Sequence, residues 1–264
     1  MSPVPLSSLR RLVLRLAVAL PWLAAACAEP TSRPLSVFAA SSLTEAFAEL
    51  EMEMEAVEPG VDVVVSTGGS QALRVQIEQG APADVLASAN ADHIDALVKA
   101  GLVTQSLPFA EGQLVLVVPP GNPAGLGSLE DLPTATRIVL GSPEVPVGQY
   151  ARTLLDLAET RYGAGFRGRV EEHVVSLEPN VRQVLAKVEL GEADAAIVYR
   201  SDVVASRDVV VIEIPAELAV PARYFVGVTT AAAEPELAQR FVERLRSAAG
   251  RAVLERHGFR AADG

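Results

Sequence analysis

Residues 35–47 read LSVFAASSLTEAF, an apolar run of six residues followed directly by a more polar, helix-forming stretch. The continuous apolar run at 35–40 predicts a strand buried on both faces, and Phe47, Leu50 and Met54 have the spacing of one face of a helix. A strand followed at once by an amphipathic helix is the repeating unit of α/β proteins. This stretch therefore predicts the α/β class.

The same alternation of strands and helices continues along the chain. Strands are expected at residues 35–40, 61–67, 83–89, 113–118, 137–142, 195–199, 209–214 and 224–228. Amphipathic segments such as 181–188 separate most of them, and one or two further helices are expected from Glu234 to about Arg256. Apolar strands between helices predict mainly parallel sheets covered on both faces. Spacing alone does not distinguish two lobes from a single doubly wound domain.

The first 27 residues differ in composition from the rest. Residues 12–26 are apolar apart from Arg15, too short and too interrupted to span a bilayer, and they predict a secretory signal peptide. Three alanines precede Cys27, the single cysteine of the chain, as in a bacterial lipobox. We therefore expect Cys27 to be lipidated, with residues 28–34 as a tether. Ordinary cleavage after an Ala-x-Ala site, with Cys27 incidental, is the alternative.

The charge balance excludes some classes of partner. The 264 residues carry 22 Lys and Arg against 33 Asp and Glu, a formal net charge of -11. The basic surface that nucleic acids or anionic membranes require is therefore not expected. Residues 163–168 match G-x-G-x-x-G but follow a helical stretch and lead toward a strand, the reverse of a dinucleotide site. His93 and His173 lack metal-ligand spacing, so neither a metal nor a cofactor is expected.

Four strand-to-helix junctions carry helix-start signals. Ser42 and Glu45 fit a capping box, and Asn180 fits an N-cap. The other two junctions are 68–70, before a helix that Gly80 can end, and the proline-rich 142–148. Each helix start presents unpaired N–H groups and a partial positive charge of about half a unit. If the four converged on one cleft they would bind an anion without Lys or Arg, although each alone is ordinary capping.

A serine hydrolase is the rival interpretation. Residues 68–72 approach the G-x-S-x-G nucleophile motif, with Asp202 and His257 following in hydrolase order. However, Ala72 replaces the last glycine, and His257 lies at the end of a terminal helix, where capping is the plainer role. Both interpretations thus assign a role to Ser70, as an anion ligand in one and as a nucleophile in the other.

The ordered set of junction motifs resembles one family. The segments are FAASSLTEAF (38–47), GGSQALRVQIEQGAPADVLASA (68–89), PEVPVGQYA (143–151), NVRQVLAKVELGEADAAIVYRSD (180–202) and ERHGF (255–259). Together they resemble the molybdate-binding proteins of ABC transporters, over about residues 35–259. The resemblance implies a type II periplasmic-binding fold, with a ligand cleft between two α/β lobes. Lobe 1 would hold residues 35–112 and 226–264, and lobe 2 residues 113–225.

The resemblance also implies the ligand set. The oxyanion, molybdate or tungstate, would be held by the hydroxyl and backbone N–H of Ser42 and Ser70, the backbone N–H of Val147 and Val181, and the Tyr199 hydroxyl. A fully ionised oxyanion only accepts hydrogen bonds, so a site made of neutral donors suits it. Val147 stands where the family usually has alanine, which a main-chain donor tolerates. Sulfate, phosphate or another small anion is the alternative ligand.

The resemblance finally implies a cellular role. The protein would be exported to the periplasm or the outer face of the cytoplasmic membrane, held there only by the lipid on Cys27. It would act as a monomer without catalytic activity, and would deliver the oxyanion to an ABC permease and its ATPase.

Overall fold

The computed structural model describes residues 34–204, 206 and 208–262. The expectations for the signal peptide and for Cys27 lie outside these residues. The α-helices are α1 Thr44–Val57, α2 Ser70–Glu78, α3 Ala91–Lys99, α4 Pro146–Tyr162, α5 Phe166–Glu171, α6 Val181–Glu189, α7 Arg200–Val204, α8 Pro235–Arg246 and α9 Ala248–Arg256. The 3-10 helices are η1 Ser41–Leu43, η2 Leu129–Thr134 and η3 Ala216–Leu218.

The strands include one at each expected position. They are β1 Leu35–Ala40, β2 Val63–Gly68, β3 Val85–Ser88, β4 Leu107–Val118, β5 Ile138–Gly141, β6 Val174–Glu178, β7 Ala195–Tyr199, β8 Val210–Ile212, β9 Pro221–Val228 and β10 Arg260–Ala261. The expected set lacked β6 and the two-residue β10. Strand β6 is the last strand in the sheet order, and its Val175 and Leu177 side chains are exposed. It therefore lacks the continuous apolar run that marks a buried strand.

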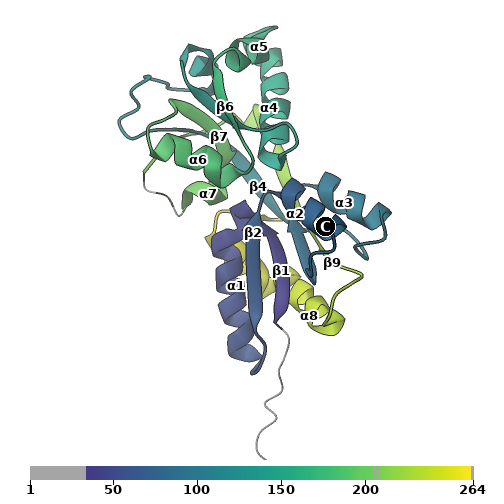
Figure 1. Ribbon diagram of the computed structural model, residues 1–264. Coiled ribbons are helices and arrows are strands. Elements are labelled where there is room, and N and C mark those ends of the chain that lie inside the picture. The colour runs from purple at the N-terminus through teal and green to yellow at the C-terminus, as the bar shows by residue number, and fades with distance from the viewer. Residues whose placement is uncertain (1–33, 205, 207, 263–264) are drawn as a thin grey trace, which may run out of the picture. The chain divides into compact units, whose positions relative to one another are not determined.

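Strand β4 belongs to two groups of strands (Figure 1). Its residues 107–113 pair with β9, which continues to β3, β1 and β2; we call these the first strand group. Its residues 114–118 pair with β7 and β8, and β7 continues to β5 and β6; we call these the second strand group. The lobe boundaries given above stay a prediction.

The sheets are more mixed than the expected, mainly parallel arrangement. The pairings β1 with β2 and β3, and β5 with β6 and β7, are parallel. All the antiparallel pairings of named strands involve β4 or β9. The chain leaves the first strand group through β4 and returns through β9, and these two strands run in opposite directions.

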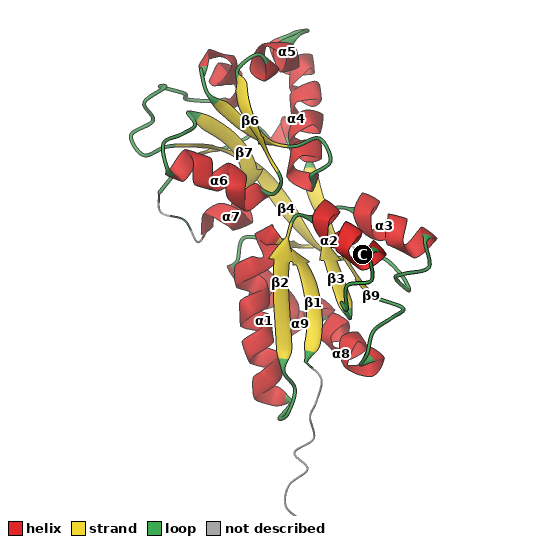
Figure 2. Ribbon diagram, in the orientation of Figure 1, coloured by secondary structure: helices red, strands yellow, loops and turns green. Residues whose placement is uncertain are grey.

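Helices flank both strand groups (Figure 2). Helix α1 packs against β2 and α9, α8 packs against β9, and α4 packs against β5 and α5. Phe47 of α1 is fully buried and contacts the rings of Phe109 and Phe241, with centroids 6.3 and 5.8 Å away. Burying a side chain of this size contributes roughly 1.5–3 kcal/mol, so these contacts fix α1 on the sheet.

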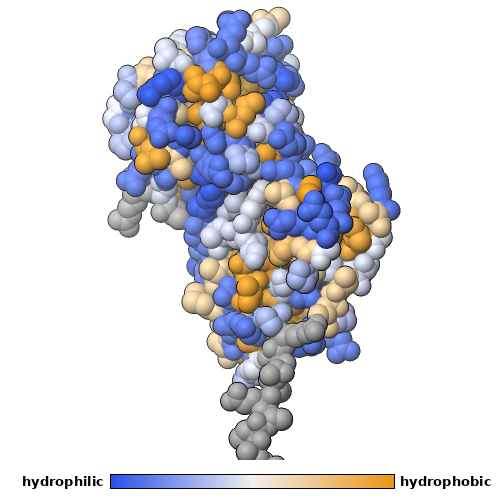
Figure 3. Space-filling model, in the orientation of Figure 1, coloured by the Kyte–Doolittle hydropathy of each residue, from blue (hydrophilic) through white to orange (hydrophobic). Residues whose placement is uncertain are grey.

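Hydrophobic surface on the face shown in Figure 3 is broken into patches with hydrophilic residues between them. Exposed large apolar side chains, such as Met52 in α1 and Leu190 just after α6, lie on different elements. Within the described part of the chain, no helix is long and apolar enough to cross a membrane.

Candidate functional site

A small pocket lies where the carboxyl ends of β1, β2 and β3 face those of β5, β6 and β7. Its volume is about 210 Å³, including the part open to solvent. The ends of parallel strands are the usual ligand position in open α/β sheets. The residues proposed from the sequence, Ser42, Ser70, Val147, Val181 and Tyr199, all line this one pocket.

Three α-helices begin at the pocket. Helix α2 starts at Ser70, α4 at Pro146 and α6 at Val181, and the first N–H groups of a helix have no acceptor within it. Pro146 has no N–H, so the first N–H that α4 presents is that of Val147. The three helix starts, at three of the four junction motifs, place partial positive charge at one point.

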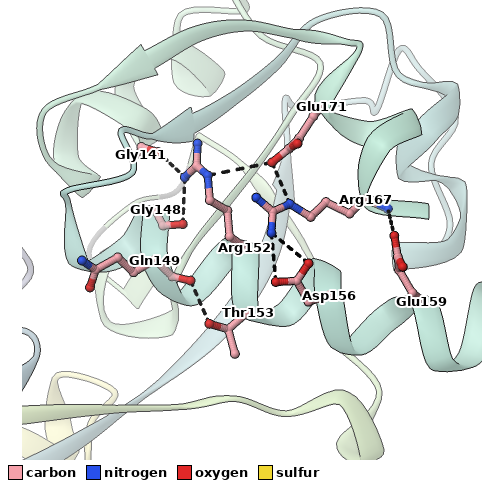
Figure 4. Close-up of polar contacts among 9 residues, drawn as sticks. All are labelled: Gly141, Gly148, Gln149, Arg152, Thr153, Asp156, Glu159, Arg167 and Glu171. Atoms are coloured by element: carbon pink, nitrogen blue, oxygen red, sulfur yellow. Dashed lines mark hydrogen bonds and ion pairs between the residues drawn. The ribbon is translucent and has the colours of Figure 1, made fainter. Parts of the chain in front are cut away.

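The start of α4 is held against the end of β5 (Figure 4). Arg152 Nη1 donates to the carbonyl oxygens of Gly141 at 3.0 Å and Gly148 at 2.9 Å. A Cβ on Gly148 would lie 2.1 Å from the Ser142 carbonyl oxygen, so only glycine allows this approach. The Val147 N–H next to it is thus fixed in position by packing of the main chain.

The two proposed serine ligands, Ser42 and Ser70, are buried and already hydrogen bonded. Ser70 Oγ accepts from the Ala89 N–H at 3.1 Å, which leaves its own hydrogen free to be donated. Ser42 Oγ lies 2.9 Å from the Tyr224 hydroxyl oxygen, and either group can donate.

The capping box expected for Ser42 and Glu45 is wrong. The 3-10 turn η1 precedes α1, whose N-cap is Leu43, and no side chain caps it. Glu45 instead bonds to Arg182. By contrast, Asn180 Oδ1 accepts from the Gln183 N–H at 3.0 Å, which confirms the expected cap of α6.

Tyr199 offers an unused donor. Its side chain is 1% exposed, and its hydroxyl has no hydrogen-bond partner among the described residues. Its ring contacts those of Tyr150 and Tyr224 edge-on, at 6.3 and 5.8 Å between centroids. Burial raises the pKa of Tyr199 well above its usual value, so the hydroxyl keeps its proton. A buried, unpaired hydroxyl costs free energy unless something accepts its hydrogen.

Three contacts across the pocket were not anticipated from the sequence. Gln71 Nε2 donates to the Pro179 carbonyl oxygen at 2.7 Å, and Asn90 Nδ2 donates to Gln149 Oε1 at 2.7 Å. Arg182 Nε donates to the Ser41 carbonyl oxygen at 3.2 Å. Each contact joins a residue that follows a strand of the first group to one that follows a strand of the second. The only sequence signal was that Gln71 and Arg182 directly follow expected ligands.

The hydrolase residues are engaged elsewhere. His257 Nε2 lies 2.7 Å from Glu49 Oε2, Asp202 faces Arg182 with Oδ1 3.2 Å from Nε, and Ser70 Oγ bonds to the Ala89 N–H. These contacts join α9 to α1, α7 to α6, and α2 to the end of β3. None of the hydrogen bonds found among the described residues links Ser70 to His257, so this structure does not support a nucleophile–base pair.

The other motifs also have structural roles. Gly163 and Gly165, with φ of 91° and 75°, form the turn between α4 and α5, so residues 163–168 lead into a short helix before β6. His93 Nε2 lies 3.0 Å from the Glu144 carbonyl oxygen, and burial lowers the pKa of His93. No cluster of three or more His, Cys, Asp or Glu suited to a metal ion occurs in the described ranges.

A larger hollow lies away from the donors. It has about 680 Å³, open solvent included, and is lined by parts of β4, η3, β9 and β10, including Glu111 and Arg260. None of the five proposed ligand residues lines it. We take the smaller pocket as the candidate site because unpaired donors converge there.

The fold and the pocket define a solute-binding protein. The family described as bacterial extracellular solute-binding proteins matches residues 35–260, and the chain belongs to this family. The molybdate-binding protein ModA of Mycobacterium tuberculosis is 36% identical over 231 residues, covering 86% of this chain and 85% of the relative. The resemblance to molybdate-binding proteins is thereby confirmed.

Two solved structures share the fold. The periplasmic molybdate-binding protein of Azotobacter vinelandii has a TM-score of 0.74 at 22% identity, covering 87% of this chain and 100% of the other. The sulfate-binding protein SubI of Mycobacterium tuberculosis has a TM-score of 0.77 at 21% identity, covering 88% of each chain. At these identities the likeness shows the fold alone. It confirms the predicted α/β periplasmic-binding fold.

Proposed function

We propose that this protein captures molybdate or tungstate outside the cytoplasm and delivers it to an ABC importer. The observation that carries the proposal is the convergence of Ser42, Ser70, Val147, Val181 and Tyr199 on one pocket. The likeness of the chain to ModA proteins supports the choice of ligand.

The donor set suits a tetrahedral dianion. Each hydrogen bond to a charged group contributes about 1.5–3 kcal/mol, and helix starts add a local positive potential. The net charge of -11 cannot attract an anion over long range, so attraction must come from these nearby dipoles. None of the five ligand positions carries a carboxylate, which disfavours monoprotonated phosphate because that ion also needs an acceptor.

The cellular setting is part of the proposal. We infer that residues 1–27 direct export and that lipid on Cys27 holds the protein at the outer face of the cytoplasmic membrane or in the periplasm. Its partners would be an ABC permease and ATPase, which it would meet as a monomer without resident cofactor or metal. It would not be an enzyme, since Ser70 has a ligand role here.

Anion selectivity is the first test. Calorimetric titration of the purified protein is expected to show molybdate and tungstate binding more tightly than sulfate, and phosphate more weakly still. Sulfate is the control because the structural likeness to a sulfate-binding protein makes it the strongest rival. Sulfate binding as tightly as molybdate would overturn the ligand assignment and leave the fold unaffected.

Tyr199→Phe should separate affinity from stability. The change removes the hydrogen bond from the Tyr199 hydroxyl to the anion, so affinity is expected to fall about 10- to 150-fold. Because the hydroxyl is buried and unpaired in the protein itself, the free energy of unfolding without ligand should stay equal or rise slightly. Titration calorimetry and urea unfolding measure the two effects.

Tyr162→Phe is the matched control, because Tyr162 packs on Phe166 at the far end of α4. It should leave affinity unchanged. If Tyr199→Phe also bound molybdate as the unmodified protein does, Tyr199 would be excluded from the site.

A further inference from the structure

Arg182 directly follows the proposed ligand Val181 in the first turn of α6. Its Nε donates to the Ser41 carbonyl oxygen at 3.2 Å and lies 3.2 Å from Asp202 Oδ1. Its Nη2 bonds to a carboxylate oxygen of Glu45. Two of its nitrogens, Nε and Nη2, thus donate to protein acceptors. We call these contacts the Arg182 bridge.

The bridge joins segments that carry three of the five proposed ligands. Ser41 and Glu45 follow β1 and flank Ser42, while Asp202 lies three residues after Tyr199 at the end of β7. Arg182 itself adjoins Val181. Ser41 and Glu45 belong with the first strand group, and Arg182 and Asp202 belong with the second. Two of the three contacts thus cross between the groups.

The two sides of the bridge differ in burial. Asp202 is fully buried and lies in the same strand group as Arg182, so this contact does not depend on how the groups approach each other. Arg182 and Glu45 are part-exposed, with 28% and 35% of their side chains accessible. Arg182 therefore stays with the second strand group, on α6 and beside Asp202, while the contacts to Ser41 and Glu45 form and break.

We propose that Arg182 is a positioning residue for anion capture: carried by α6 of the second strand group, it bonds to Ser41 and Glu45 only when the two strand groups close on the pocket. The inference rests on the proposed function. Any contact made only in the closed state shifts the population toward that state and slows release of the ligand. Arg182 also pairs the Glu45 carboxylate, which would otherwise stand unpaired near an anion site.

Arg182→Gln, made in the full protein, tests the bridge. The variant loses a charge-assisted bond to Ser41 and the pair with Glu45, so molybdate affinity should fall about 10- to 100-fold. The loss should come from faster dissociation, with the association rate changed less than about threefold. Tyrosine emission in stopped flow can follow both rates, because Tyr199 lines the pocket and its ring contacts those of Tyr150 and Tyr224.

Glu45→Gln removes only the part-exposed pair and should weaken binding about 2- to 5-fold. The double variant should bind about as Arg182→Gln alone does, because the pair is already broken. Arg161→Gln is the matched control: it breaks an exposed pair with Glu217 between α4 and η3 and should leave both rates unchanged.

Arg182→Gln combined with Asp202→Asn guards against misfolding, since it leaves no buried carboxylate without its partner. It should still show the faster dissociation. Unchanged dissociation in folded Arg182 variants would overturn the proposed role of Arg182 and leave the proposed function intact. Fully additive losses when Arg182→Gln is combined with Glu45→Gln would do the same. An unmodified protein that binds none of molybdate, tungstate, sulfate or phosphate would overturn the proposed function, and the bridge with it.

Discussion

Gly69→Ala is expected to weaken oxyanion binding by roughly 100-fold or more while leaving the fold intact. A Cβ on Gly69 would lie 2.5 Å from the Pro179 carbonyl oxygen, far inside van der Waals contact. Gly69 follows β2 and Pro179 follows β6, so the clash is between the two strand groups. The backbone of Gly69, at φ -66° and ψ 134°, is open to alanine. Within the first group the added Cβ would meet only the end of the flexible Gln71 side chain, at 2.6 Å, which can move aside.

The loss should therefore appear in affinity and not in stability. The bond from Gln71 Nε2 to the Pro179 carbonyl oxygen would be displaced together with closure of the pocket. Titration calorimetry gives the affinity, and urea unfolding without ligand should give a midpoint close to that of the unmodified protein.

Gly168→Ala is the control for Gly69→Ala. Gly168 lies in α5, and a Cβ there would meet nothing within 4 Å. It should keep full affinity and gain up to about 1 kcal/mol, because alanine favours the helix. Binding by Gly69→Ala at the unmodified level would mean that the strand groups close without this contact.

Much of the fold could be predicted because its signals are local. Apolar runs such as 35–40 can be satisfied only by burial on both faces, and they form β1 and its neighbours. Asn180 caps α6, and Gly80, with φ of 88°, follows the end of α2. Each of these features depends on a few adjacent residues, so the sequence carries it directly.

The contacts around the pocket depend on residues distant in the chain. Ser42 was expected to cap α1, but its hydroxyl is hydrogen bonded to that of Tyr224, 182 residues away. Glu45 likewise bonds to Arg182, 137 residues away, and not to its own helix start. Both are tertiary contacts that override a local capping preference, and spacing within a motif cannot reveal them. Spacing within a motif likewise could not bring the five ligand positions together, so they were predicted from the resemblance to a known family.

Asp202 should make stability fall as pH rises through the acid range. The residue lies in α7, is fully buried, and has Arg182 Nε 3.2 Å from Oδ1 but out of line for a hydrogen bond. Burial raises the pKa of Asp202 from 3.8 to about 7, although Arg182 opposes the shift and Glu45 adds to it. The phenol groups of Tyr199 and Tyr224, also buried nearby, stay neutral because burial raises their pKa values.

The sign follows from proton linkage. Between pH of about 4 and 7 the folded protein keeps the Asp202 proton, while the unfolded chain has released it. Folding then takes up a proton, so the contribution of Asp202 to the free energy of unfolding falls as pH rises through this window. A shift of about three pKa units corresponds to a loss on the order of 4 kcal/mol across the window.

Asp202→Asn should remove this pH dependence, because the amide does not titrate. Urea unfolding is measured at intervals from pH 4 to pH 8. As pH rises, the free energy of unfolding of the variant is expected to increase relative to that of the unmodified protein by up to about 4 kcal/mol. The other carboxylates titrate in both proteins, so the difference isolates Asp202. Asp156→Asn, at an exposed partner of Arg167, should instead track the unmodified protein. A difference constant over this range would mean that Asp202 stays ionised beside Arg182 throughout.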